Sequence, residues 1–324
     1  MRFHDHALIG AAKHIPVNSA TPVFTFSPIV LRYPERPVDL ELKVTAPSTG
    51  DALPIILLSH GQGRSNHLNS LEGYTPLAEF WAAHGFVVIQ PTHLSSLSLG
   101  LQAPKGQEYY WQDRAQDMSR VLDQLDTIEA AVPGLKGRLD RCKVAVAGHS
   151  LGAWTANLLL GAENTDARDG SVVSKLEKRI KVGVVLTGTG SGGLALSELG
   201  RGMVPFYGPD FSEMSTPALI VCGEEDVSPH LTTRGADWHA ECYHLSPGPK
   251  DLFWVKGAKH GLGGISGWDA AETQDEGPER LGAVQRVTLA YLRSALYEGD
   301  RAWDEACKAL EKHGELGWVE SKNK

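Results

Sequence analysis

A short apolar segment, Val144–Ala147, leads directly into the pattern Gly-His-Ser-Leu-Gly at residues 148–152. An uninterrupted apolar run of this length is typical of a strand that is buried on both faces. Apolar residues then recur at helical spacing as Trp154, Leu158 and Leu159. A strand, a tight turn with a serine between two glycines, and a helix together indicate a nucleophile elbow. An ordinary Gly/Ser turn is the competing interpretation, and the flanking strand and helix disfavour it. The sequence therefore predicts Ser150 as a nucleophile.

The composition is that of a globular protein with a sizeable core. The 324 residues are 42% hydrophobic and 22% charged, the formal net charge is −8, and no block of Lys and Arg occurs. This charge balance argues against a nucleic-acid or anionic-membrane surface. No apolar run approaches the roughly 18 residues of a membrane span. The first residues carry charge without a following apolar region, so we expect no signal peptide in this numbering and a cytoplasmic protein, with a secreted mature form left open.

The four cysteines form no CxxC pair. Cys142 and Cys222 lie at or inside apolar runs and are expected to be buried. Free thiols are the default expectation, although a Cys222–Cys242 bridge is conceivable. The His4-Asp5-His6 sequence could chelate a metal, but a flexible terminus is the preferred interpretation, and no metal site is predicted.

Strand-like and helix-like segments alternate along the chain, which predicts an α/β fold with a mostly parallel central sheet and helices on both faces. We expect one domain over residues 1–324, a cap or long loop at about 187–215, and a C-terminal extension at about 300–324 that adds one short helix and ends in a frayed terminus. The stretch 1–21 is expected to be irregular. Two strands, Val23–Leu31 and Val38–Val44, should form an antiparallel pair. The further predicted strands are 54–59, 85–91, 144–147, 180–186, 218–223 and 251–255, and the main predicted helices are 74–84, 107–131 and 277–297.

A serine needs a positioned base before it becomes a good nucleophile. In this architecture the acid and then the histidine follow the serine along the chain. Asp226 comes after the strand 218–223, and His260 comes after the strand 251–255. We therefore predict Asp226 as the acid and His260 as the base. Glu224 and Glu225 are competing acids that lie closer to the strand end. His60 and His149 are interpreted as structural, and the connecting segment holds His230, His239 and His244.

Acyl transfer also requires donors for a developing oxyanion. The backbone N–H of Leu151 is one predicted donor. The second is expected from the loop His60-Gly61-Gln62-Gly63, at the end of the strand 54–59, and we assign it to Gln62. A plain tight turn is the competing interpretation of this loop.

Taken together, SHGQG, GHSLG, GEEDVSP and GAKHG resemble the motifs of α/β-hydrolases. The stretch SHGQGRSN…LAEFWAAHGFVVIQPTH…RAQDMSRVLDQL further resembles the branch that holds dienelactone-hydrolase-like, chlorophyllase-like and platelet-activating-factor-acetylhydrolase-like enzymes, which is similar to the polyester hydrolases (cutinases). The resemblance covers roughly residues 53–265. The resemblance implies that the residue after His-Gly lends an oxyanion N–H, which supports Gln62. The chain departs from this branch in two ways. A true dienelactone hydrolase has a cysteine nucleophile where Ser150 stands, and Ala153-Trp154 replaces a pair of small residues after the elbow.

Several aromatic residues are candidates for the substrate pocket, and packing in the core is an equal alternative for each. These are Tyr109, Tyr110, Trp111, Trp154 and Trp268. Arg114 and Asp117 are expected to form a solvated i,i+3 pair on a helix surface. No nucleotide fingerprint occurs, so no cofactor is predicted.

The sequence thus predicts a cofactor-independent serine esterase that forms an acyl-enzyme on small or medium carboxylic esters. Lipase-, lactonase- or polyester-type substrate ranges are the enzymatic alternatives, together with perhydrolysis or acyl transfer by the same triad. A hydrolase-fold binding protein with slow turnover is the alternative from another class. The expected partner is a small-molecule ester, without nucleic acid or an integral membrane segment, and the oligomeric state stays open.

Overall fold

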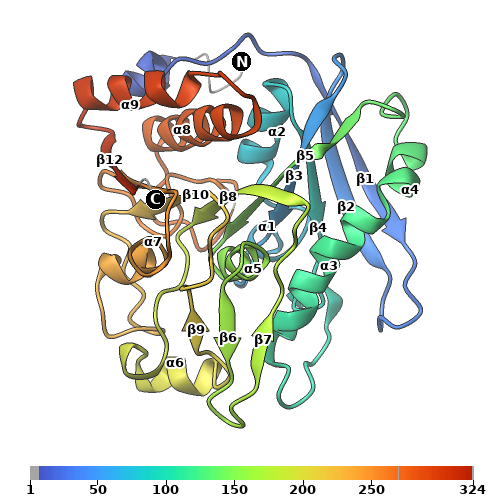
Figure 1. Ribbon diagram of the computed structural model, residues 1–324, viewed down its shortest axis with the longest axis vertical. Helices are drawn as coiled ribbons and strands as arrows, with labels where there is room; N and C mark the ends of the chain where they lie inside the picture. Colours follow the sequence, from blue (N-terminus) through green and yellow to red (C-terminus); the bar gives the residue numbers. More distant parts are fainter. Residues whose placement is uncertain (1–6, 269, 323–324) are drawn as a thin grey trace.

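The computed structural model describes residues 7–268 and 270–322 of the chain (Figure 1). The His4-Asp5-His6 sequence therefore lies outside the described residues. The centre of the molecule is a nine-stranded sheet in the order β1-β2-β4-β3-β5-β8-β10-β11-β12. Its strands are β1 (Val23–Leu31), β2 (Leu40–Pro47), β3 (Leu53–Ser59), β4 (Val87–Pro91), β5 (Leu139–His149), β8 (Ile180–Leu186), β10 (Ala218–Gly223), β11 (Lys250–Val255) and β12 (Gly317–Lys322).

The strands from β4 to β11 in this order all pair in parallel. Antiparallel pairs close both sides of the sheet: β1 with β2 and β2 with β4 on one side, and β11 with β12 on the other. The predicted mixed α/β class and the mostly parallel sheet are confirmed. The predicted antiparallel pair near the N-terminus is confirmed as well.

Alternate residues of the central strands supply two separate cores. On β3, Ile55 and Leu57 belong to one core, whereas Ile56 and Leu58 belong to the other. Since neighbouring side chains on a strand point to opposite faces, a strand covered on both faces needs a continuous apolar run. This requirement explains why these strands are the clearest elements in the sequence.

Helices cover both faces of the sheet (Figure 1). The first core packs under α3 (Trp111–Asp123), α4 (Leu125–Ala131) and α5 (Leu151–Leu159). The second packs under η2 (Ala7–His14), α2 (Thr75–Ala83), α8 (Pro278–Leu296) and α9 (Ala302–Lys312). A short helix, α1 (Asn66–Asn69), follows β3.

Several features differ from the sequence-based expectation. The predicted helix 107–131 is divided into η4 (Glu108–Tyr110), α3 and α4, with non-helical backbone at Tyr109 and a break at Gln124. Part of the stretch 1–21, expected to be irregular, forms η2. A small second sheet joins β6 (Glu163–Thr165), β7 (Val172–Ser174) and β9 (Pro209–Asp210). The C-terminal extension carries the expected helix, α9, but continues into β12 rather than a frayed end through residue 322.

The stretch 187–215 contains short elements instead of a bare loop, namely η5 (Gly193–Ala195), α6 (Glu198–Met203) and β9. All four cysteines are free thiols, so the Cys222–Cys242 bridge is not formed. Cys222 is buried as expected, but Cys142 is exposed because it lies in the outer, partly solvated half of β5. Among the described residues, no helix combines the length and the apolar composition needed to cross a membrane.

Candidate active site

Ser150 occupies the turn between β5 and α5. Its backbone has φ 55° and ψ −120°, a conformation that non-glycine residues rarely adopt. The Ser150 N–H donates to the Leu186 carbonyl at the end of β8, 3.0 Å away. The strained turn is therefore held by the neighbouring strand, and strain of this kind gathers at functional sites.

The two glycines of the pattern are required by close backbone contacts. A Cβ at Gly148 would lie 2.0 Å from the Gly152 carbonyl oxygen, and a Cβ at Gly152 would lie 2.1 Å from the Ser59 carbonyl oxygen. No side chain fits at such distances, so α5 can approach β5 and the loop after β3 only through glycine.

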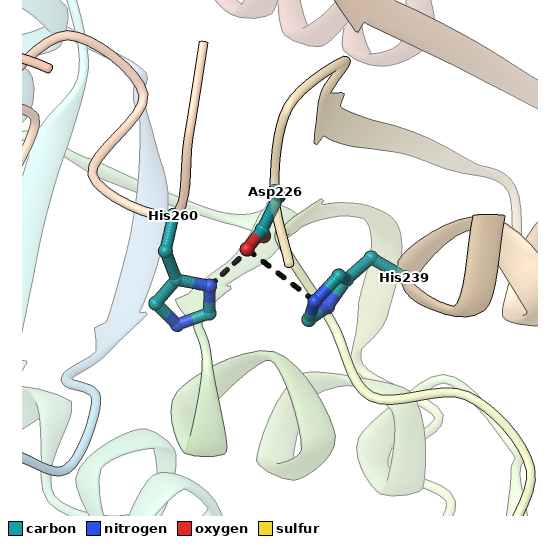
Figure 2. A group of neighbouring side chains, drawn as sticks. All are labelled: Asp226, His239 and His260. Atoms are coloured by element: carbon teal, nitrogen blue, oxygen red, sulfur yellow. Dashed lines mark hydrogen bonds and ion pairs between the residues drawn. The ribbon is translucent and has the colours of Figure 1, made fainter. Parts of the chain in front are cut away.

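Asp226 and His260 lie on the loops that follow the adjacent parallel strands β10 and β11. The His260 Nδ1 atom is 2.9 Å from Asp226 Oδ2, as Figure 2 shows. Asp226 is fully buried, whereas the His260 side chain is 35% exposed. The structure thus brings the predicted acid and base into direct contact.

The competing carboxylates have other surroundings. Glu224 accepts from Lys256 Nζ at 2.8 Å and from the Gly257 N–H at 3.1 Å, and Glu225 is exposed.

Burial and charge act in opposite directions on this pair. Burial disfavours the imidazolium of His260, but the charge of Asp226 and its hydrogen bond outweigh burial and raise the pKa of His260 above its usual value. Burial likewise disfavours the Asp226 carboxylate, yet His260 and then His239 lower its pKa. The carboxylate therefore favours a charged His260 ring.

His149, which directly precedes Ser150, connects the elbow to the His260 loop. The His149 and His260 rings lie 4.9 Å apart, and His149 Nε2 donates to the His260 carbonyl oxygen at 2.8 Å. Within the described part of the chain, neither Ser150 Oγ nor His260 Nε2 forms a hydrogen bond. Catalytic hydrogen bonds often tighten only when a ligand is bound.

His149 also bonds to Tyr74. The Tyr74 hydroxyl accepts the Gly61 N–H at 2.9 Å and lies 2.9 Å from His149 Nδ1. Because Nε2 donates to the His260 carbonyl, Nδ1 of a neutral ring can only accept. The Tyr74 hydroxyl proton faces both this nitrogen and the more distant Leu68 carbonyl oxygen, at 3.2 Å. Burial, followed by the charge of His260, lowers the pKa of His149 to about 3, so the ring is neutral. A single chain of hydrogen bonds therefore joins the loop after β3, the elbow and the His260 loop.

Two backbone N–H groups face no protein acceptor beside Ser150. Within the described residues, neither the Gln62 nor the Leu151 N–H donates a hydrogen bond. Both residues line the same cavity as Ser150. The Gln62 side chain is occupied separately, since its Nε2 donates to the Ser95 carbonyl at 3.1 Å. Free N–H groups at a helix N-terminus and a loop can bind an anionic oxygen.

The cavity beside Ser150 measures about 690 Å³ including its open mouth. Its lining is mostly apolar and joins the elbow to residues 189–207 and 230–238. The lining residues are Gln62, Tyr109, Ser150, Leu151, Trp154, Thr189, Leu196, Met203, Val204, Phe206, Tyr207, His230, Leu231 and Trp238. A cavity of this kind fits an uncharged apolar group.

Of the five aromatic candidates, Tyr109 and Trp154 line the cavity. The other three do not belong to its lining. Tyr110 is buried and its hydroxyl donates to the Gln102 carbonyl, and Trp111 is buried with its ring stacked 4.9 Å from Phe206. Trp268 is 40% exposed and lies over Gly264. The sequence pattern missed Phe206, Tyr207 and Trp238, whose positions depend on how residues 187–240 fold over the sheet edge.

The prediction of a solvated Arg114–Asp117 pair is wrong, because both side chains are fully buried and bond elsewhere. Arg114 donates to Thr155 Oγ1 at 3.0 Å and to the His60 carbonyl, and burial lowers its pKa to about 9. Asp117 is bound by Arg36 at 3.0 Å, by Arg120 at 3.1 Å and by His93 at 3.1 Å. Through its hydrogen bond to the His60 carbonyl, Arg114 therefore holds the loop that carries Gln62.

Two carboxylates of the segment after His260 hold the loops around the site. Asp275 Oδ2 accepts the Lys259 N–H at 2.8 Å and the Gly263 N–H at 3.1 Å. Glu272 accepts from the N–H of Arg64 and from both the N–H and the hydroxyl of Ser65. No local sequence signal identifies these contacts, since Glu272 and Ser65 are 207 positions apart.

No family model matches the chain, and a comparison with curated proteins also finds no match.

We expect Gly152→Ala to destabilise the protein by about 1–3 kcal/mol or more, because the new methyl group meets the Ser59 carbonyl in a packed core. Urea unfolding followed by circular dichroism measures the change. Gly202→Ala is the matched control: it lies in α6 with open space around its Cβ position and should be neutral or slightly stabilising. Equal stability of the two variants would contradict the close contact.

We expect Tyr74→Phe to cost about 1–3 kcal/mol, because it leaves the buried Gly61 N–H and His149 Nδ1 without their partner. The same unfolding measurement applies. Tyr291→Phe is the control, since Tyr291 is buried and its hydroxyl makes no hydrogen bond within the described chain. If both variants lose the same stability, the Tyr74 hydroxyl is not the link described above.

Proposed function

We propose that the protein is a serine hydrolase of the α/β-hydrolase fold that cleaves carboxylic esters without a cofactor. The observation that carries the proposal is the 2.9 Å contact between His260 Nδ1 and the buried Asp226, beside a strained Ser150 that opens into an apolar cavity. The order serine, acid, histidine along the parallel strands β5, β10 and β11 supports it.

In the proposed reaction, His260 Nε2 accepts the Ser150 proton while Ser150 Oγ attacks the ester carbonyl. Asp226 holds the proton on Nδ1 and stabilises the imidazolium that forms. The N–H groups of Gln62 and Leu151 bind the oxyanion, and they are available because they donate to nothing else within the described chain. The imidazolium then protonates the leaving alcohol. Water, activated by the same ring, cleaves the acyl-enzyme.

The cavity supports esters in which one side of the carbonyl carries an uncharged apolar group. Trp154 and Phe206 contribute aromatic surface to its lining, and Thr189 and His230 contribute the polar groups beside them. No Lys, Arg, Asp or Glu belongs to this lining among the described residues, so a charged group there would lose its hydration without a counter-ion.

Ser150→Ala should lower the rate of p-nitrophenyl ester hydrolysis by at least about a thousandfold, because the attacking oxygen is removed. A fluorophosphonate probe should label wild-type protein at Ser150, located by mass spectrometry. Ser48→Ala, at an exposed serine after β2, should keep both the rate and the label. Absence of both turnover and labelling in the wild type would contradict the esterase proposal and favour a ligand-binding protein.

The rate should also depend on pH through His260. The neutral ring is the base, so kcat/KM should be highest above the pKa of His260 and should decrease as the pH falls through it. Because Asp226 raises that pKa, the midpoint should lie above about 6.5.

Asp226→Asn should move this midpoint to lower pH and reduce kcat by up to about 10⁴-fold. Glu225→Gln, an exposed neighbour on the same loop, should leave the profile unchanged. A profile that is flat between pH 5 and 8 in the wild type would count against His260 as the base.

A further inference from the structure

The Asp226 carboxylate faces two histidines, of which the proposed reaction uses only one. Its Oδ2 contacts His260, whereas its Oδ1 lies 3.4 Å from His239 Nε2 (Figure 2). Oδ1 is buried and accepts no hydrogen bond within the described chain. His239 lies on η6 (Ala236–Ala240) and is 1% exposed. A buried carboxylate oxygen without a donor is unusual and requires an explanation.

The other nitrogen of His239 determines its tautomer. His239 Nδ1 is 2.6 Å from the Gly188 carbonyl oxygen, which can only accept, so Nδ1 carries a proton. In a neutral ring Nε2 then has a lone pair, and this lone pair faces Asp226 Oδ1. The Ser228 hydroxyl, 3.3 Å away, donates to this lone pair and would have to turn away when an ion binds there. Two electron-pair donors thus point toward the same small space.

This arrangement matches that of metal ligands. A ligating histidine usually donates its other N–H to a carbonyl, as His239 does to Gly188. Two ligands of a tetrahedral Zn²⁺, each about 2.0–2.2 Å from the ion, are separated by about 3.3 Å. The observed separation between Nε2 and Oδ1 is 3.4 Å. One ligand atom from each of Asp226, His239 and His260 lies within 4.8 Å of the others.

We propose that Asp226, His239 and His260 form an inhibitory Zn²⁺ site. Imidazole nitrogens and a carboxylate are ligands that Zn²⁺ prefers, and three protein ligands leave the fourth tetrahedral position to water. Binding itself depends only on the geometry of these three residues. The inhibitory effect rests on the proposed function.

The inhibition follows from the position of the protons. When Zn²⁺ takes the Nδ1 lone pair of a neutral His260, the Nδ1 proton moves through solvent to Nε2, and the ring stays neutral. Nε2 then carries a proton and cannot accept another from Ser150. Asp226 is bound to the metal at the same time and no longer orients the ring. The ion therefore blocks the base without occupying the apolar cavity.

The first test is calorimetric titration of ZnCl₂ into Ser150→Ala protein at neutral pH, which requires no catalytic activity. We expect one Zn²⁺ per chain. Adding His239→Gln should weaken binding by at least about tenfold, as for the loss of a metal ligand or its support. Adding His313→Gln should leave the affinity unchanged, although His313 also has a histidine beside it, with its ring stacked 4.5 Å from His14. No binding, or equal affinity after His239→Gln, would overturn the site and leave His239 as a charged partner of Asp226.

A second measurement avoids the His239→Gln variant, which could fold poorly because His239 is buried. Co²⁺ bound to Ser150→Ala should give the visible absorption of a tetrahedral ion with nitrogen ligands, and Zn²⁺ should displace it. An octahedral Co²⁺ spectrum would overturn the assignment.

In wild-type protein, Zn²⁺ should abolish ester hydrolysis and a chelator should restore it. Zn²⁺ bound at one site with undiminished hydrolysis would overturn the inhibitory role. A wild type that binds Zn²⁺ but hydrolyses no ester would instead contradict the proposed function and leave the metal site standing.

Discussion

The hydrogen bonds through the neutral ring of His149 hold the site together. One nitrogen accepts from Tyr74, which in turn accepts the Gly61 N–H, and the other nitrogen donates to the His260 carbonyl. The pKa of His149, about 3, keeps the ring neutral at ordinary pH, so both bonds keep their direction. Three loops that follow three different strands are thereby fixed relative to one another at a point beside Ser150.

The sheet explains why these loops meet at all. Parallel strands end at one common edge, so Ser150, Asp226 and His260 come together although they are far apart in the sequence. Charged side chains that form hydrogen bonds with the backbone hold the loops around these three residues. Arg114 supports the His60 carbonyl, and Asp275 holds the N–H groups on both sides of His260. Side chains that bond to backbone in this way fix a loop without depending on its local sequence.

The parts that could be predicted from sequence are those with a local signature. Strands buried on both faces appear as continuous apolar runs, and Ser150, Asp226 and His260 each follow such a run. The strand β12 escaped prediction because Gly317–Lys322 lies at the edge of the sheet and has no continuous apolar run. Arg114 and Asp117 have the spacing of a surface pair, and only the packing of α3 against the face of the sheet reveals that they are buried. His239 and Asp275 could not be assigned because their partners come from distant loops.

The elbow combines two constraints that differ in origin. Gly148 and Gly152 are demanded by the approach of α5 to the backbone around it, and this demand holds whether or not any reaction takes place. Ser150 is under the opposite demand, because glycine would relieve the strain of its φ of 55°. If the proposed reaction is correct, relatives that lack it should keep both glycines while residue 150 changes, and relatives that perform it should keep all three residues. The two glycines therefore report on the packing of the fold, and only residue 150 would report on the proposed reaction.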